Sequence, residues 1–138
     1  MLRAVFATRR YAKGRSVVEW ATFSRPTRMH IADILKDQKP TLSFEFFPPK
    51  SAEASEALFT TIGELEAYKP AFVSVTYGAG GTTRDLTHDL VVRIKKTTSL
   101  DPVPHLTCVC HSEADVAGIL ERYAEAGVSN ILALGGDP

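Results

Sequence analysis

The chain has 138 residues, 44% of them hydrophobic and 23% charged, with a formal net charge of zero. This composition is typical of one globular domain with a hydrophobic core and excludes a disordered chain. The balanced charge gives no bulk attraction to nucleic acid or to a membrane surface, and no apolar run approaches the roughly 20 residues that span a bilayer.

Basic residues are concentrated at the start of the chain. Residues 1–28 hold seven lysines and arginines but a single acidic residue, Glu19. An arginine-rich, acid-poor start is typical of an organellar transit peptide, but a disordered basic leader or a true start at Met29 would give the same composition. We therefore assign residues 1–28 to a basic leader outside the fold and residues 29–138 to the folded unit.

The two cysteines, Cys108 and Cys110, are one residue apart. So close a pair disfavours a structural disulfide, and a reducing compartment is the simplest interpretation. A cytoplasmic location is expected, or a mitochondrial one if residues 1–28 are a transit peptide.

Hydrophobic periodicity and breaker residues divide the rest of the chain into alternating helices and strands. The predicted elements are helix 30–37, strand 41–46, helix 51–67, strand 71–76, a helix capped by Thr82 with Asp85, strand 105–108, a helix capped by Ser112 with Asp115, and strand 130–134. Apolar stripes predict the buried faces of the three long helices: Leu58, Ile62 and Leu65; Leu86, Leu90, Val91 and Ile94; Val116, Ile119, Leu120 and Tyr123. Gly127 suits the end of the last helix.

This βαβαβαβ order predicts parallel strands joined by helices. A doubly wound open sheet and a (β/α)₈ barrel both fit the pattern. A barrel needs about 250 residues, and this chain stops directly after its fourth strand. We therefore expect the chain to be the first half of a longer α/β protein.

The first strand carries the most informative residue. Strands alternate faces, so Ser43 and Glu45 point one way while Phe44 and Phe46 point the other, before Pro48 and its neighbour end the strand. The phenylalanines favour a packed layer. An ionised carboxylate on the opposite face is costly unless it is paired or reaches a wet cleft, which makes Glu45 a candidate functional residue.

Ligands of parallel α/β folds bind at the C-terminal ends of the strands, and polar residues stand at every predicted strand end. They are Glu45; Thr76 and Tyr77 with the glycine-rich turn 78–81; His105 and Thr107; and Gly135, Gly136 and Asp137. An acid, a histidine, a threonine and an aspartate on one apolar-walled rim favour a cofactor-assisted proton or hydride transfer over hydrolysis.

Each candidate also has a structural explanation. Glu45 could pair with Lys50, and His105 could be a satisfied interior histidine. The turn at 78–81 is neither a P-loop nor a dinucleotide fingerprint, so it could be a connector. Asp137 could simply open a turn.

Histidines and cysteines cluster near the third strand, but no metal site is predicted there. Alternation puts His105 opposite Cys108, and no second ligand pair accompanies them.

Five segments of the chain resemble the methylenetetrahydrofolate reductase family, in the same order and at plausible spacing. They are residues 43–50 (SFEFFPPK), 72–79 (FVSVTYGA), 85–88 (D-x-T-H), 105–108 (HLTC) and 131–138 (ILALGGDP). The resemblance runs from about residue 40 to the end, and residues 1–28 have no counterpart.

The resemblance implies a (β/α)₈ barrel that holds non-covalent FAD at its C-terminal rim. It implies that NADH or NADPH reduces the flavin, and that 5,10-methylenetetrahydrofolate is then reduced to 5-methyltetrahydrofolate in one-carbon and methionine metabolism. A small-molecule folate is the expected partner, with no nucleic acid or membrane, and the intact enzyme is expected to be a homo-oligomer.

The resemblance also implies roles for single residues. Glu45 matches the general acid that protonates N10 of the folate, and Asp137 matches an aspartate beside flavin and folate. Thr76 matches a position that touches nicotinamide and flavin. The further flavin-binding positions are Tyr77, Ala79, His105 and Gly136.

Gly135 departs from the family pattern, because arginine often occupies this flavin-binding position, and the glycine puts the local contact in doubt. Two alternatives stand beside the enzyme hypothesis. The chain as given is a non-catalytic fragment of such an enzyme, or it is another α/β protein that binds phosphate or a small molecule through the turn at 78–81.

Overall fold

The computed structural model of the chain describes residues 30–37, 40–78 and 83–135. The predicted leader at 1–28 and the predicted site residues Ala79, Gly136 and Asp137 lie outside this described part.

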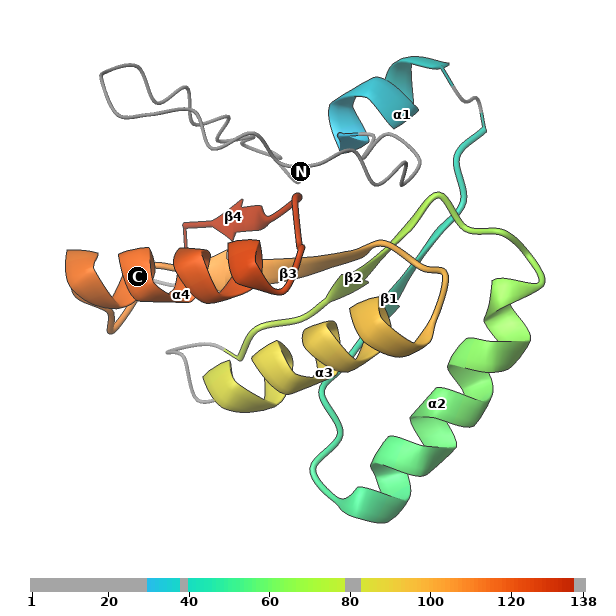
Figure 1. The fold of residues 1–138 in the computed structure, drawn as a ribbon, viewed down its shortest axis with the longest axis horizontal. Helices are drawn as coiled ribbons and strands as arrows, with labels where there is room; N and C mark the ends of the chain where they lie inside the picture. Colours follow the sequence, from blue (N-terminus) through green and yellow to red (C-terminus); the bar gives the residue numbers. More distant parts are fainter. Residues whose placement is uncertain (1–29, 38–39, 79–82, 136–138) are drawn as a thin grey trace, which may run out of the picture.

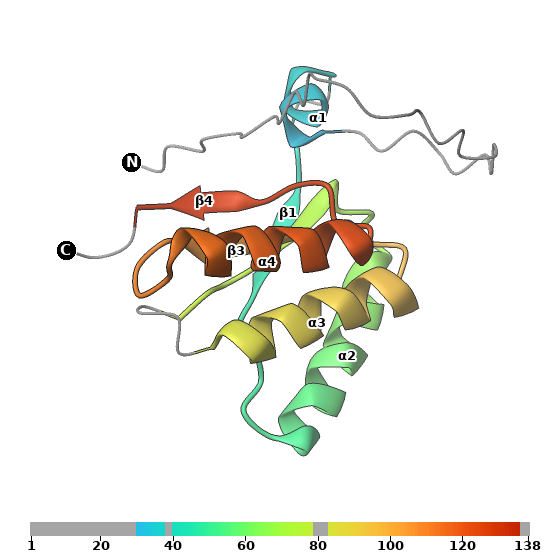
Figure 2. The same ribbon diagram turned by 60° about the vertical axis from the view of Figure 1, so that its left-hand side comes forward.

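Helices and strands alternate through the described part in the predicted order. The elements are α1 (Ile31–Asp37), β1 (Ser43–Phe46), α2 (Ala52–Glu66), β2 (Phe72–Val75), α3 (Arg84–Thr97), β3 (Pro102–Thr107), α4 (Glu113–Glu125) and β4 (Leu132–Leu134). The strands form one parallel sheet in the order β1-β2-β3-β4. Figures 1 and 2 show α2, α3 and α4 side by side over one face of that sheet.

The strand order decides between the two predicted architectures. In a doubly wound sheet the chain reverses direction across the sheet, and helices cover both faces. Here each strand lies beside the preceding one, and the three long helices lie on a single face. This is the arrangement of the first four strands of a (β/α)₈ barrel, so the predicted fold class is confirmed.

The hydrophobic core lies between the sheet and these helices. Phe46 is buried and Phe44 is partly buried, and both pack in this layer as the alternation of β1 predicts. The strands contribute Val73, Val75, Tyr77 and Leu106, and the helices contribute Ile62, Leu90, Val91, Ile94, Ile119 and Tyr123. The opposite face of the sheet carries the polar residues Glu45, Ser74, His105 and Thr107 beside apolar ones such as Val103 and Leu134.

Two residues of the predicted apolar stripes are exposed instead. Leu86 is 43% exposed and Leu120 is 41% exposed. On α3 the buried stripe starts at Thr87, which precedes Leu90 by three residues and lies on the same helical face. The buried stripe predicted from the sequence included Leu86 and left out Thr87. That prediction was wrong, because a hydroxyl that is hydrogen-bonded can be buried.

The start of α3 was also misplaced by one residue. Thr83, not Thr82, is the N-cap, and its side chain makes no capping hydrogen bond. Its hydroxyl instead accepts a hydrogen bond from the amide of Gly78.

Strand β3 begins earlier than predicted and includes Pro102 and Pro104. The amide of Val73 in β2 donates to the carbonyl of Asp101, so the odd-numbered residues of β3 direct their N–H and C=O groups toward β2. The backbone of the even-numbered Pro102 and Pro104 is therefore directed toward β4. The pairing of β3 with β4 begins only at His105. Their missing N–H groups remove no ladder hydrogen bond, and the strand accommodates them.

The ends of α4 are as predicted. Ser112 and Asp115 form a reciprocal capping box. At the other end, Gly127 has a positive φ of 80°, and the amide of Val128 donates to the carbonyl of Tyr123. This pattern is a Schellman termination, which a glycine at this position allows.

A polar network anchors α1 at the end of the sheet where the strands begin. Asn130, just before β4, is buried, and its side-chain oxygen accepts from the amide of Ile31 at 3.2 Å. Its side-chain nitrogen donates to Asp101 at 3.4 Å, and Lys95 pairs with the same carboxylate at 2.5 Å. The network joins α1, α3 and the starts of β3 and β4, at the end of the sheet opposite the predicted site.

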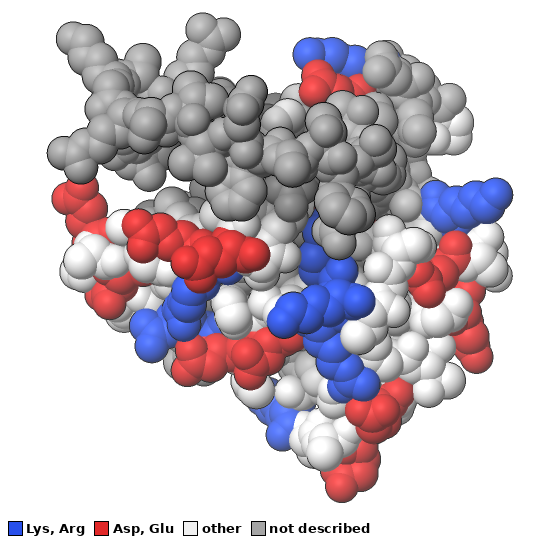
Figure 3. Space-filling view, viewed as in Figure 1, with Lys and Arg blue, Asp and Glu red and all other residues white. Residues whose placement is uncertain are grey.

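The helix-covered face carries charges of both signs. Acidic and basic side chains are interspersed over the helices on the face shown in Figure 3. Among the helices described, none combines the length and the apolarity needed to cross a bilayer.

Replacing Asn130 by alanine is expected to lower the free energy of unfolding by about 1–3 kcal/mol, because the buried amide of Ile31 loses its partner. Urea unfolding measures the loss. Lys36→Ala is the matched control on α1, because its pair with Asp33 is exposed and should contribute less than about 1 kcal/mol. Equal losses in the two variants would contradict the anchoring role of Asn130.

Candidate active site at the strand ends

The strand register brings the predicted polar residues onto one face of the sheet. Glu45 of β1 pairs with Ser74 of β2, and Ser74 pairs with Val103 of β3. Paired residues of parallel strands point to the same side, and His105 and Thr107 follow Val103 at the same parity. All of these side chains therefore lie on the face opposite the helices, which is the interior of a barrel.

Glu45 is the centre of this polar group. Its side chain is 50% exposed, its Oε2 accepts a hydrogen bond from the Ser74 hydroxyl at 3.1 Å, and His105 Nε2 lies 3.4 Å from the same oxygen. No ion pair joins it to Lys50, although both residues are described. The structural alternative of a Glu45–Lys50 pair is therefore wrong, and the carboxylate is directed into the predicted site.

His105 is 8% exposed and lies beside Glu45. Burial lowers its pKa below the ordinary value, and the negative charge of Glu45 opposes this shift only in part. The approach of Nε2 to Glu45 lacks hydrogen-bond geometry, and this nitrogen has no hydrogen-bond partner in the described part of the chain. His105 is thus a buried histidine with a lowered pKa, and its Nε2 has no hydrogen-bond partner among the described residues, so it is not a satisfied interior histidine.

Thr76 and Tyr77 follow β2 at the same rim. The amide of Thr76 donates to the carbonyl of Phe46 at 3.0 Å, which extends the β1–β2 pairing to the strand end. Tyr77 points to the helix side, where it is buried in the core. Burial raises the pKa of its phenol, and a hydrogen bond of 2.8 Å joins Tyr77 Oη to His111 Nε2. Its side chain therefore anchors the β3–α4 loop, and only its backbone faces the rim.

A hydroxyl relay, formed by Thr83 and Thr87, holds Thr76 and Gly78 against the start of α3. The amide of Gly78 donates to Thr83 Oγ1 at 2.7 Å, and Thr87 Oγ1 donates to the carbonyl of Thr76 at 3.0 Å. The two hydroxyl oxygens are 3.3 Å apart. Because the hydrogen of Thr87 is already used, Thr83 must donate to Thr87, and every hydroxyl hydrogen in the relay is assigned.

This relay bears on the phosphate-binding alternative. A phosphate at the glycine turn 78–81 would need free backbone amides. Residues 79–81 lie outside the described part of the chain, and the amide of Gly78 is donated to Thr83. The relay instead makes the first turn of α3 a fixed support for Thr76 and Gly78.

Gly135 follows β4 and is exposed. A Cβ added to it would meet no atom within 4 Å. Crowding by the described residues therefore does not require a glycine at this position.

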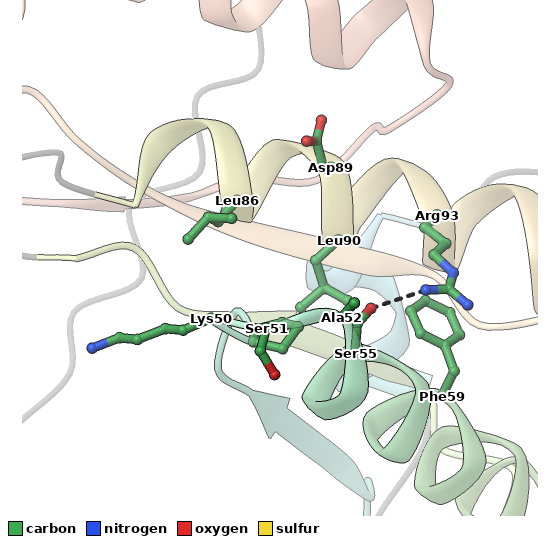
Figure 4. A pocket seen from close by; sticks show the side chains of 10 residues that line it. Lys50, Ser51, Ala52, Ser55, Phe59, Leu86, Asp89, Leu90 and Arg93 are labelled. Atoms are coloured by element: carbon green, nitrogen blue, oxygen red, sulfur yellow. Dashed lines mark hydrogen bonds between the residues drawn. The ribbon is translucent and has the colours of Figure 1, made fainter.

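A groove of about 410 Å³ lies between α2 and α3, on the helix side of the sheet. Figure 4 shows Arg93 reaching from α3 to Ser55 of α2, with its guanidinium over the ring of Phe59. None of the predicted site residues lines this groove. We assign it to helix packing.

Both cysteines are free and exposed. Among the residues that the structure describes, no group of three or more His, Cys, Asp or Glu side chains is arranged to hold a metal ion.

Comparison with known proteins identifies the family of the chain. The sequence model of the methylenetetrahydrofolate reductase family matches residues 30–138. The chain belongs to the methylenetetrahydrofolate reductase family. The match starts at His30, one residue before α1, and does not include residues 1–28.

Individual relatives are similar over the same region. A 5,10-methylenetetrahydrofolate reductase from Pectobacterium carotovorum is 46% identical over 96 residues, and one from Escherichia coli is 44% identical over 96 residues. Each alignment covers 70% of this chain and 32% of the relative. A methylenetetrahydrofolate reductase (NADH) 1 from Arabidopsis thaliana is 37% identical over 108 residues, which is 78% of this chain and 18% of the relative. The chain thus spans about a third of the length of the bacterial relatives.

The sequence analysis missed three residues that form hydrogen bonds to predicted site residues. Ser74 could have been found, because alternation and the pairing of neighbouring strands put it beside Glu45. Thr87 was visible as a polar residue at a buried helical spacing. His111 carried no signal, because its bond to Tyr77 depends on how a loop returns to a distant strand.

The buried His105 predicts a pH-dependent stability. The unfolded chain takes up a proton near the ordinary histidine pKa of 6.5, whereas the folded chain resists protonation at this site. The unfolded state then binds more protons, so this contribution makes the free energy of unfolding fall as the pH drops below about 6.5. Urea unfolding at about pH 7.5 and about pH 5.5 should show a smaller decrease in His105→Gln than in the unsubstituted chain. Parallel pH profiles would refute this interpretation of His105.

The hydroxyl relay predicts local loosening when it is cut. Thr87→Val keeps the shape of the side chain but leaves Thr83 and the carbonyl of Thr76 without their partner. We expect the variant to lose about 1–3 kcal/mol of unfolding free energy and to show faster amide hydrogen exchange at Gly78. Thr97→Val, on the exposed end of the same helix, is the control and should leave Gly78 unchanged. Unchanged exchange at Gly78 in Thr87→Val would rule out the relay as its support.

Proposed function

We propose that the protein to which this chain belongs reduces 5,10-methylenetetrahydrofolate to 5-methyltetrahydrofolate, using FAD and a nicotinamide coenzyme. The observation that carries the proposal is the polar group of Glu45, Ser74 and His105 at the strand ends, in a chain of this family. A half-exposed carboxylate with oriented neighbours suits proton transfer to a bound substrate.

The residues present fit a flavin. His105 Nε2 and Thr107 Oγ1 are buried polar atoms of the inner face without partners among the described residues, and both can bond to a polar ligand. When bound, FAD would supply the hydride chemistry, and the protein would supply binding and orientation. In this proposal Thr76, Tyr77, Ala79, His105, Gly135, Gly136 and Asp137 hold the cofactor, with Tyr77 acting through its backbone.

Glu45 would act as the general acid toward N10 of the folate. Both of its observed contacts go to Oε2, one from the Ser74 hydroxyl and one from the edge of His105. These contacts leave Oε1 as the oxygen that carries the transferable proton. The half-exposed position would let the substrate reach it, while Ser74 holds the carboxyl group in one orientation.

Asp137 would complete the site at the end of β4. A negative charge there would favour the cationic iminium form of the folate that opens after protonation at N10. Gly135 supplies no cation of its own, so any charge that balances the cofactor at this point must come from another residue.

The coenzyme and the setting of the enzyme belong to the same proposal. The Arabidopsis relative carries NADH in its name, and NADH or NADPH is the reductant we propose. We also propose a homo-oligomer, as the family resemblance implies, located in the cytoplasm or, if residues 1–28 are a transit peptide, in the mitochondrion.

Replacing Glu45 by glutamine tests the proposal. The variant is made in a hybrid, in which this chain replaces the matching segment of the Escherichia coli relative. Reduction of the flavin by NADH or NADPH should persist, because that step needs no proton from Glu45. Reduction of methylenetetrahydrofolate should fall by about 10²- to 10⁴-fold, because the general acid is lost.

Stopped-flow absorbance of the flavin measures the two half-reactions separately. Ser74→Ala is the matched control, because it removes the partner of Glu45 but keeps the acid, and it should cause a smaller loss. The 138-residue chain alone is expected to lack both half-reactions. If Glu45→Gln retained folate reduction, the assignment of the general acid would be wrong.

A further inference from the structure

Thr107 is the last residue of β3 and is 4% exposed. Its Oγ1 has no hydrogen-bond partner in the described part of the chain. Thr87 shows the usual alternative, because its buried hydroxyl is fully used by Thr76 and Thr83. A buried hydroxyl without a partner destabilises the folded chain, whereas a valine would fill the same volume without that cost.

The unpartnered hydroxyl lies in the predicted site. Thr107 is the next inward-facing residue after His105, so the two side chains stand about 7 Å apart along the same face of β3. The two residues carry the unpartnered buried side-chain atoms of the described chain. His105 lies toward the Glu45 side, and Thr107 lies one step closer to the C-terminal rim.

Thr107 lies next to the last strand of the described sheet. Thr107 pairs with Leu134 of β4, and the next residue is Gly135. The side chain of Leu134 therefore stands beside Thr107 on the inner face, and Gly135 follows with the opposite parity. A ligand that lay along the inner face from the end of β4 toward Glu45 would meet the hydroxyl of Thr107 and then the imidazole of His105.

We infer that Thr107 is a further cofactor-binding residue, whose hydroxyl bonds to a polar group of the flavin together with His105. The inference rests on the proposed function, which supplies the identity of the ligand. A threonine hydroxyl both donates and accepts, so it suits a heterocycle or polyol that offers several nitrogen and oxygen atoms along one edge. The free chain keeps an unfavourable buried group that the bound cofactor satisfies.

Stability and FAD affinity are expected to change in opposite directions in Thr107→Val. In the 138-residue chain, the urea midpoint of this variant should equal or exceed that of the unsubstituted chain, because valine removes an unpartnered hydroxyl. Thr87→Val is the matched control and should lower the midpoint, because it removes a hydroxyl with two partners. In the hybrid with the Escherichia coli relative, Thr107→Val should bind FAD about tenfold more weakly by flavin fluorescence. Thr107→Ser, which keeps the hydroxyl, should bind FAD as the unsubstituted hybrid does.

The outcomes separate this inference from the proposed function. If the unsubstituted hybrid fails to bind FAD, the proposed function falls, and the role of Thr107 falls with it. If the hybrid binds FAD and Thr107→Val binds it equally well, only the role of Thr107 is overturned. A midpoint of Thr107→Val as low as that of Thr87→Val would show that the hydroxyl has a partner in the free chain, which also overturns the inference.

Discussion

The two-sidedness of a parallel strand is the constraint on which the rest of this structure depends. In β1, β2 and β3 every second side chain points into the helix-covered core, and the intervening ones point to the inner face. Phe46, Val75 and Leu106 fill the core layer, while Glu45, Ser74 and His105 take the opposite face. Because successive strands are parallel and adjacent, the inward residues of three strands meet at one rim. The site is therefore a consequence of the same alternation that builds the core.

The loops at that rim are held by bonds to the rigid elements behind them. The hydroxyls of Thr83 and Thr87 join the first turn of α3 to Thr76 and Gly78. The phenol of Tyr77 joins the end of β2 to His111 of the next loop. Each bond comes from a buried or half-buried side chain, so the scaffold holds the loops without placing these side chains in the site. Loops supported in this way can present backbone groups to a ligand at little cost in entropy.

The inner face carries buried polar atoms that lack hydrogen-bond partners among the described residues, in contrast to the core. Buried polar groups in folded proteins are generally bonded, and the N-terminal edge of this sheet follows that rule through Asn130 and Asp101. Toward the C-terminal ends of the strands, the buried side-chain atoms of His105 and Thr107 have no hydrogen-bond partner among the described residues. The two ends of the sheet therefore differ: at one end internal hydrogen bonds satisfy the buried polar groups, and at the other two buried polar atoms have no partner among the described residues, as the proposed cofactor site requires. Sites of binding and catalysis commonly retain such local destabilisation.

The sequence by itself determined the order of the elements, the faces of the strands and the position of Glu45 at a strand end. These follow from periodicity and from breaker residues, which are local properties. The capping box of Ser112 and the left-handed Gly127 were predictable for the same reason. Only the tertiary structure decided that each strand lies beside the preceding one, that Thr87 rather than Leu86 is buried, and that Tyr77 forms a hydrogen bond with His111. Each of these depends on contacts between residues distant in the chain, and on whether a polar group finds a partner when it is buried. A pattern of residue types carries no record of that partner.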